Sequence, residues 1–301
     1  MPSRKEHGVK TKHKKKNKLK PIHIILFALA LAVLAVLVAK SYTLHRQSRI
    51  ASDPHYGHVE VFNGDTYVWI VPDKDVELNP LKKEDFALDE EGRPTYVGGE
   101  YKAIRGIDVS QYQGDIDWQA VYDDGVRFAV IRAGGRYYGS GNIYSDDMFA
   151  KNLEGAKNAG IKVGVYFFSQ AISADEAREE ARYTAELIGD TEIDLPVFFD
   201  WERVTEDESR TDGLDGATLT DCAVAFCEEL EALGFDAGVY VYSETAYYGY
   251  KLSELDDYTI WCSCVGNYPY FYYAHTMWQY SFKGEIDGID HKCDVDMMFI
   301  K

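Results

Sequence analysis

Two carboxyl side chains close an apolar run in the middle of the chain. Asp200 and Glu202 follow the apolar residues 195–199, LPVFF. If this run is a β-strand, the two side chains share one face and their Cα atoms lie about 6.5 Å apart. Two carboxyls held close together in an apolar cavity cannot both ionise readily, so one keeps its proton beside the other, which is a carboxylate. Hydrolysis of a glycosidic bond requires such a pair, although a solvated loop start or a helix-capping acid shows the same spacing.

Two further acids stand at apolar segments. Asp108 lies in GIDVS at residues 106–110, and Asp294 lies in CDVDMMF at residues 293–299. Each is a weak signal alone. If all four acids converge on one site, a chemical role is favoured, because burying unpaired acids without a function is costly.

Eight short β-like runs position these acids, and five of them are followed by amphipathic helical stretches. The runs cover residues 106–110, 127–134, 162–169, 195–202, 236–243, 258–265, 275–281 and 293–299. Apolar strands alternating with helices predict a parallel sheet buried on both faces. Eight strands favour an α/β barrel of five βα units plus three β-strands, with the site at the carboxyl ends of the strands. A doubly wound open sheet is the alternative, but no glycine-rich dinucleotide motif follows the first strand.

Aromatic residues stand at the same strand ends and are candidates for stacking on a sugar ring. Ordinary filling of the barrel is the competing interpretation for each of them. Among the candidates, the sequence most favours Trp278 and Tyr280 as substrate contacts. The expected substrate-binding side chains are Tyr166, Phe168, Tyr240, Trp261, Trp278 and Tyr280, with Tyr242 beside them.

The first 40 residues are typical of export. Residues 1–20 carry a net charge of +8, and residues 22–39 form an 18-residue apolar run. About 20 apolar residues cross a bilayer, and the basic flank is expected to stay in the cytoplasm. A cleaved signal peptide is the alternative, but its apolar region is shorter and ends at a small-residue cleavage site. We therefore predict a single-pass membrane protein with an extracellular catalytic domain, or a secreted protein if the segment is cleaved.

The remaining boundaries follow from composition. We predict a basic cytoplasmic tail at residues 1–20, a transmembrane anchor at 21–40 and a stalk at 41–56. A small β-rich extension, with a hairpin turn at Asn63-Gly64-Asp65, is expected at 57–104, and the barrel at 105–301.

Charge and cysteine use exclude other classes of protein. The whole chain has a net charge of −18, so the part after residue 20 carries −26, which disfavours nucleic acid as a partner. The sequence contains five cysteines without zinc-site spacing, and we expect buried thiols rather than a disulfide scaffold. No metal or cofactor is implied, and a monomer is expected.

Several segments together resemble the family 25 glycoside hydrolases, which are lysozyme-like N-acetylmuramidases. They are GIDVSQYQGDIDW at 106–118, GVYFFS at 164–169, VFFDWE at 197–202, WQYS at 278–281 and GIDHKCDVDMMF at 288–299. The resemblance covers about residues 106–301 and implies a barrel of five βα units plus three β-strands. It also implies cleavage of the β-1,4 bond between N-acetylmuramic acid and N-acetylglucosamine in peptidoglycan.

By the same resemblance, Glu202 is the general acid. Asp200 either assists the N-acetyl group of the substrate or acts as the nucleophile, and Asp108 and Asp294 are supporting acids. Two departures bear on substrate preference: Asp296 stands where the family commonly has Asn, and Trp261-Cys262-Ser263 replaces Trp-x-Ala. A wall-binding module without catalysis and a chitinase-like glycosidase are the alternative functions.

Overall fold

The computed structural model describes residues 21–205 and 207–301, which divide into two compact units. The boundary between the units falls between Gly57 and His58.

The first unit contains one long helix, α1 (Pro21–Ser52). Its segment Ile25–Ser52 reaches a mean hydropathy of 2.3 over an 18-residue window, and none of that window is buried. The polar residues expected to form a stalk continue this helix as far as Ser52, because residues 41–52 contain neither proline nor glycine. Length and composition fit both an uncleaved membrane anchor and a signal sequence.

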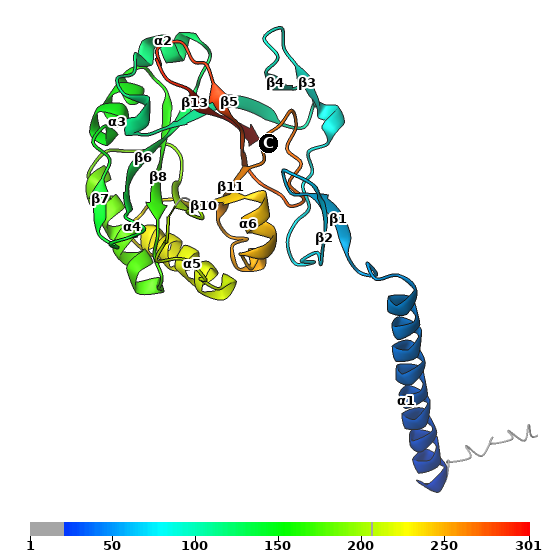
Figure 1. Ribbon diagram of the computed structural model, residues 1–301. Helices are drawn as coiled ribbons and strands as arrows, with labels where there is room; N and C mark the ends of the chain where they lie inside the picture. The colour runs from blue at the N-terminus through cyan, green and yellow to red at the C-terminus, as the bar shows by residue number, and fades with distance from the viewer. Residues whose placement is uncertain (1–20, 206) are drawn as a thin grey trace, which may run out of the picture. The chain divides into compact units, whose positions relative to one another are not determined.

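The second unit contains the predicted eight-stranded barrel (Figure 1). In spatial order, each strand pairs with the next and β5 closes the ring by pairing with β6. The strands are β5 (Lys102–Val109), β13 (Cys293–Ile300), β12 (Met277–Gly284), β11 (Thr259–Ser263), β10 (Ala237–Tyr242), β9 (Val197–Trp201), β8 (Lys162–Ser169) and β6 (Phe128–Arg136). A short extra strand, β7 (Ile143–Ser145), pairs with the end of β6.

One strand departs from the expected parallel sheet. β13 runs antiparallel to both of its neighbours, β12 and β5. The linker between β12 and β13 has too few residues for a crossover connection, so the chain can only return in the opposite direction.

Five helices follow the first five parallel strands, as the sequence predicts. They are α2 (Trp118–Asp123), α3 (Phe149–Asn158), α4 (Ala174–Ile188), α5 (Gly216–Ala232) and α6 (Ser243–Tyr248). The predicted start of α4 is confirmed, since the Ser173 side chain accepts a hydrogen bond from the backbone N–H of Glu176. Single 3₁₀ turns occur at Lys83–Asp85, Gln111–Gln113 and Leu252–Glu254.

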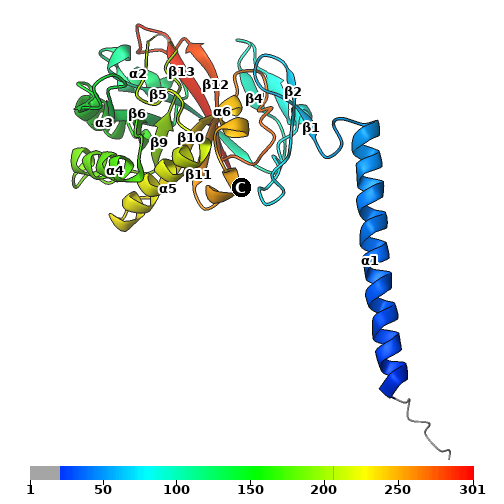
Figure 2. The same cartoon turned by 60° about the horizontal axis from the view of Figure 1, so that its bottom comes forward.

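The extension before the barrel forms two small hairpins, β1 (Val59–Phe62) with β2 (Tyr67–Ile70) and β3 (Phe86–Leu88) with β4 (Pro94–Tyr96). They lie beside the last strands of the barrel, where long helices are missing (Figures 1 and 2). Phe86 packs edge-on against Trp278, with ring centroids 5.5 Å apart. Val61 and Ile70 are buried in the same apolar core as the helices. The extension therefore substitutes for helices that would otherwise cover β11 and β12.

Side-chain alternation separates two apolar layers. The inner layer fills the barrel and includes Phe128, Phe198, Trp261, Met277 and Met298. The outer layer lies between the strands and the helices and contains all five cysteines, which are buried free thiols. The barrel thus holds its shape through packing, which fixes the positions of the strand ends.

Candidate active site

A cavity of about 330 Å³ opens at the carboxyl ends of the parallel strands. All four predicted acids line it, together with four of the six predicted aromatic residues. Its lining is Asp108, Arg132, Tyr166, Phe168, Asp200, Glu202, Tyr240, Tyr242, Trp261, Gln279, Phe282 and Asp294. The barrel therefore brings residues from all eight of its strands, or from the residues that directly follow them, to one acidic, aromatic cavity.

The predicted pair sits at the end of β9. Phe198 and Asp200 point into the barrel, while Trp201 packs in the outer layer, as alternation along a strand requires. Burial raises the pKa of Asp200 well above its usual range, and the neighbouring Glu202 carboxylate raises it further. Burial also raises the pKa of Glu202, although the Tyr242 hydroxyl, which donates to Glu202 Oε2 at 3.1 Å, opposes this. Asp200 in turn lowers the pKa of Glu202, so the pair favours one protonated carboxyl beside one carboxylate.

Gln279 joins two sides of the mouth. Its Nε2 donates to Asp108 Oδ2 at 2.7 Å, and its Oε1 accepts from the Tyr240 hydroxyl at 2.7 Å. Burial and the charges of Asp296 and Asp294 raise the pKa of Asp108, while the Gln279 hydrogen bond lowers it. Gln279 thereby fixes the orientation of the Asp108 carboxyl.

Three further carboxyls lie close together on two neighbouring strands, Asp108 on β5 and Asp294 and Asp296 on β13. Asp294 pairs with Asp108 in the sheet register, and burial raises the pKa of Asp294 to about 6. Asp296 is fully buried and accepts a 2.8 Å hydrogen bond from Trp261 Nε1. Burial, together with the charge of Asp294, raises the pKa of Asp296 to about 8. Burial therefore favours the protonated form both of Asp108 and of Asp296.

Arg132 on β6 is a positively charged side chain in the cavity lining that the sequence analysis did not select. Its Nε lies 2.7 Å from Asp146 Oδ2, and its guanidinium stands 4.9 Å from the centre of the Tyr112 ring. Its charge lowers the pKa of both Asp200 and Glu202, against the effect of burial. An arginine inside the apolar run FAVIRAG is the signal that could have revealed it.

The structure does not support two of the predicted sugar contacts. Trp278 is fully buried on the outer side of β12, where its indole N–H donates to the Cys264 carbonyl at 2.9 Å. Tyr280 also belongs to the outer apolar layer and does not line this cavity. Met277 pairs with the inward-pointing Trp261, so the residues of β12 that face inward are Met277 and Gln279. Trp278 and Tyr280 are therefore packing residues of the outer layer.

A buried side chain from the neighbouring strand holds the backbone of Glu202 in place. Gln170, which is fully buried at the end of β8, donates through Nε2 to the Glu202 carbonyl at 3.0 Å. Its Oε1 accepts from the Ser209 and Thr211 hydroxyls at 3.0 and 2.8 Å. Gln170 thus connects β8, the end of β9 and the loop that follows.

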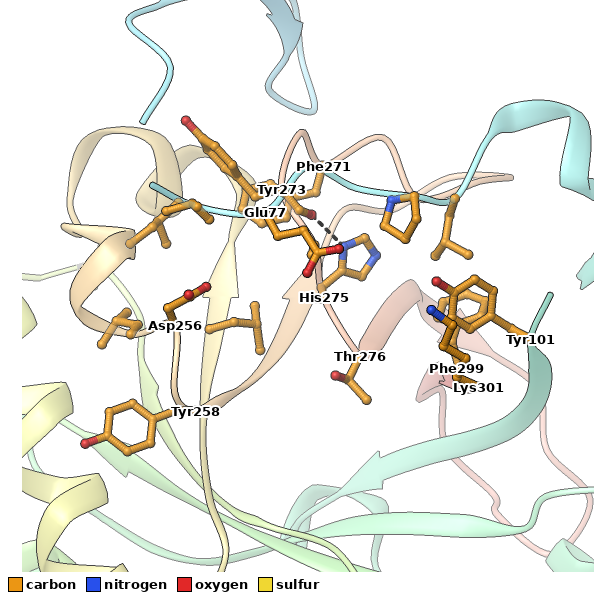
Figure 3. Close-up of a pocket in the computed structure, with 17 residues that line it drawn as sticks. Glu77, Tyr101, Asp256, Tyr258, Phe271, Tyr273, His275, Thr276, Phe299 and Lys301 are labelled. Atoms are coloured by element: carbon orange, nitrogen blue, oxygen red, sulfur yellow. Dashed lines mark hydrogen bonds between the residues drawn. The ribbon is translucent and has the colours of Figure 1, made fainter. Parts of the chain in front are cut away.

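A second cavity, of about 380 Å³, lies at the opposite end of the barrel (Figure 3). It separates the segment around Glu77 from the start of β11 and the end of β13, and its walls are mainly aromatic and aliphatic. His275 lines it, with Nδ1 3.0 Å from the Tyr273 carbonyl, and burial lowers the His275 pKa to about 4. Within residues 21–205 and 207–301, no group of three or more His, Cys, Asp or Glu side chains could hold a metal ion. The candidate active site is therefore the first cavity, at the carboxyl ends of the strands, because it contains the Asp200–Glu202 pair.

Comparison with known protein families identifies the family of this chain. The family model described as "Glycosyl hydrolases family 25" matches residues 107–289, which contain most of the barrel and three of the four acids. The chain belongs to glycosyl hydrolase family 25. The family segment starts after the two hairpins, so the extension at residues 58–101 is an addition to the matched family 25 segment.

Several family 25 relatives are named for their activity. The chain is 30% identical to the autolytic lysozyme of Clostridium acetobutylicum over 195 residues, covering 64% of this chain and 55% of the relative. It is 40% identical to lysozyme M1 of Streptomyces globisporus over 82 residues, covering 27% of this chain and 26% of the relative. The crystal structure of a lysozyme from Streptomyces coelicolor superimposes with a TM-score of 0.54 at 27% identity, covering 65% of this chain and 91% of that one. The chain thus spans about half or less of the two curated relatives' length.

Proposed function

We propose that this protein is a peptidoglycan hydrolase, a muramidase that cleaves the β-1,4 bond between N-acetylmuramic acid and N-acetylglucosamine. The observation that carries the proposal is the pairing of the buried Asp200 with the half-buried Glu202 at the mouth of a family 25 barrel. The relatives named as lysozymes supply the substrate class.

The proposed chemistry requires one protonated carboxyl beside one carboxylate. Glu202 gives a proton to the glycosidic oxygen, the bond from that oxygen to the anomeric carbon breaks, and the departing sugar leaves with a hydroxyl group. Water then adds to the anomeric carbon and returns a proton to Glu202. Asp200 stays beside the reacting centre, where a negative charge stabilises the oxocarbenium-like transition state directly or through the N-acetyl group of the substrate.

The other lining residues have supporting roles in this proposal. Asp108 and Asp294 add negative charge to the cleft, and Tyr242 orients the carboxyl of Glu202. Tyr166, Phe168, Tyr240 and Trp261 form the aromatic wall against which a sugar ring packs. Arg132 lowers the pKa of Asp200 and of Glu202. Its positive charge thereby keeps part of the carboxyl groups in the cavity ionised, although burial and their mutual repulsion favour protonation.

We further propose that α1 is an uncleaved anchor that holds the barrel on the outer surface of the cell membrane. The basic segment before the helix and the apolar length of the helix support this orientation. Fractionation followed by N-terminal sequencing of the mature protein tests it, because a cleaved signal would leave a soluble chain that starts beyond residue 40.

Digestion of purified peptidoglycan by the full chain in detergent tests the activity. Products with muramic acid at the reducing end are expected, and mass spectrometry identifies them. Glu202→Gln keeps the side-chain shape and removes the proton donor, so the rate should fall by about 10²- to 10⁴-fold. Full activity in Glu202→Gln, binding without any product, or release of sugars from chitooligosaccharides alone would each contradict the proposal.

A further inference from the structure

The hairpin β1–β2 carries an aromatic face that points away from the core. In the antiparallel register, Glu60 pairs with Trp69 and Phe62 pairs with Tyr67, so these four side chains share one face. The opposite face, which includes Val61, is buried in the outer layer. Tyr67 is 65% exposed and Trp69 is 43% exposed. The hairpin thus presents a strip of aromatic surface to solvent.

This strip is connected to the rim of the active-site cavity by direct contacts. The Ser243 hydroxyl donates to the Asn63 carbonyl at 3.1 Å, and Ser243 immediately follows Tyr242, which donates to Glu202. Figures 1 and 2 both show the hairpin beside α6, the helix that starts at Ser243. The turn of the hairpin therefore stands at the carboxyl end of β10, directly behind the cavity wall.

Tyr270 completes the connection. Its ring centroid lies 4.9 Å from that of Phe62, which in turn lies 5.4 Å from that of Tyr67. Gly64 has φ +106°, and a Cβ atom there would stand 3.0 Å from the Tyr270 hydroxyl. The glycine in the turn thus allows the hairpin to close tightly on the rim.

We propose that the aromatic strip formed by Phe62, Tyr67 and Trp69 is an additional glycan subsite, which holds a sugar ring of the same strand that is cleaved in the cavity. The proposal rests on the proposed function for the identity of the polymer. The apolar C–H face of an N-acetylglucosamine ring fits the electron-rich face of an exposed tyrosine or tryptophan. Because the hairpin lies outside the segment matched by the family model, this subsite would belong to the extension and not to the shared barrel.

Charge favours a neutral sugar over a lipid surface as the occupant. The exposed Glu60 shares the aromatic face, Asp65 lies in the turn, and Asp73-Lys74-Asp75 follows the hairpin, so the net charge of these residues is negative. Acidic side chains oppose binding to anionic lipid headgroups, whereas an uncharged pyranose ring is indifferent to them.

Comparing substrates of two lengths tests the subsite in the full chain in detergent. The double variant Tyr67→Ala/Trp69→Ala should lower kcat/KM on intact glycan strands about fivefold, with a much smaller effect on a tetrasaccharide that reaches only the cavity. Leu88→Ala removes a 50% exposed apolar side chain from the other hairpin and is the matched control, expected to behave as the unmodified chain. The conservative Tyr67→Trp should retain the preference for long strands.

A binding measurement tests the subsite independently of whether the protein cleaves peptidoglycan. Sedimentation with insoluble peptidoglycan should show about fivefold weaker binding by the double variant, whether or not the unmodified chain cleaves the polymer. Equal binding and an equal ratio of long-strand to tetrasaccharide cleavage in both proteins would overturn the subsite. In proteoliposomes, quenching of fluorescence by brominated lipids that disappears in Trp69→Phe would also overturn it, in favour of a membrane contact. Loss of cleavage of every substrate together with preserved, Tyr67-dependent binding would reject only the proposed function.

Discussion

The indole N–H of Trp261 donates a 2.8 Å hydrogen bond to Asp296 in the middle of the barrel. This bond does not compensate for the burial of a charge, since the other carboxyl oxygen of Asp296 has no hydrogen-bond partner among the described residues. Burial therefore raises the pKa of Asp296 to about 8. A carboxylic acid that stays neutral well above its usual pKa makes folding sensitive to pH.

Asp296→Asn should therefore stabilise the protein at alkaline pH. A raised folded-state pKa gives stability that is present below the unfolded pKa near 4 and is lost as the pH rises towards 8. The asparagine amide can still accept from Trp261 and can donate to Asp108, without this titration. We expect urea denaturation to show little difference at pH 4 and a gain on the order of 2 kcal/mol at pH 8. An equal effect at both pH values would contradict a raised pKa of Asp296 in the folded protein.

Tyr242→Phe should move the alkaline limb of the pH–rate profile to higher pH. The Tyr242 hydroxyl favours the ionised form of Glu202, so removing it leaves burial to raise the pKa further. Glu202 then keeps its proton to higher pH. Rates on peptidoglycan measured across the alkaline limb check this. Tyr247→Phe, which removes a hydroxyl bonded to the Tyr272 N–H, is the control and should leave the limb in place.

Gln170→Met should lower kcat without a comparable change in KM. The substitution keeps the volume but removes the hydrogen bond to the Glu202 carbonyl and both bonds to the following loop. A small displacement of the acid is costly to catalysis, and we expect a loss of about tenfold or more in kcat. Thr184→Val removes a buried hydroxyl from α4 that bonds only to the Glu180 carbonyl, so it should affect stability alone. Equal effects of both variants on kcat would assign Gln170 a purely structural role.

Trp278→Leu should destabilise the fold without weakening the enzyme's affinity for substrate. Trp278 is fully buried against Phe86 of the extension, so truncation leaves a cavity and costs about 3 kcal/mol. Thermal denaturation measures the loss, and KM of the folded fraction should be unchanged. A raised KM with normal stability would restore Trp278 as a substrate contact.

The sequence was sufficient to predict those features that depend on a few neighbouring residues, such as side-chain alternation along a strand, a turn or the start of a helix. The alternation in VFFDWE places Asp200 and Glu202 on one face whatever surrounds the strand, and apolar runs followed by amphipathic helices define the barrel. The turn at Asn63-Gly64-Asp65 and the start of α4 at Ser173 are likewise encoded by a few neighbouring residues.

The tertiary structure alone decided which face of β12 turns inward. Trp278 and Gln279 are neighbours, and a shift of one residue in register exchanges their positions. Pairing of Met277 with Trp261 sets the register, and it points Gln279 at Asp108 while sending Trp278 to the extension. Contacts between residues so distant in the chain depend on closure of the barrel, and no local pattern in the sequence contains that information. The same holds for the packing of the β1–β2 hairpin against Ser243, which only the folded chain brings to the rim of the active site.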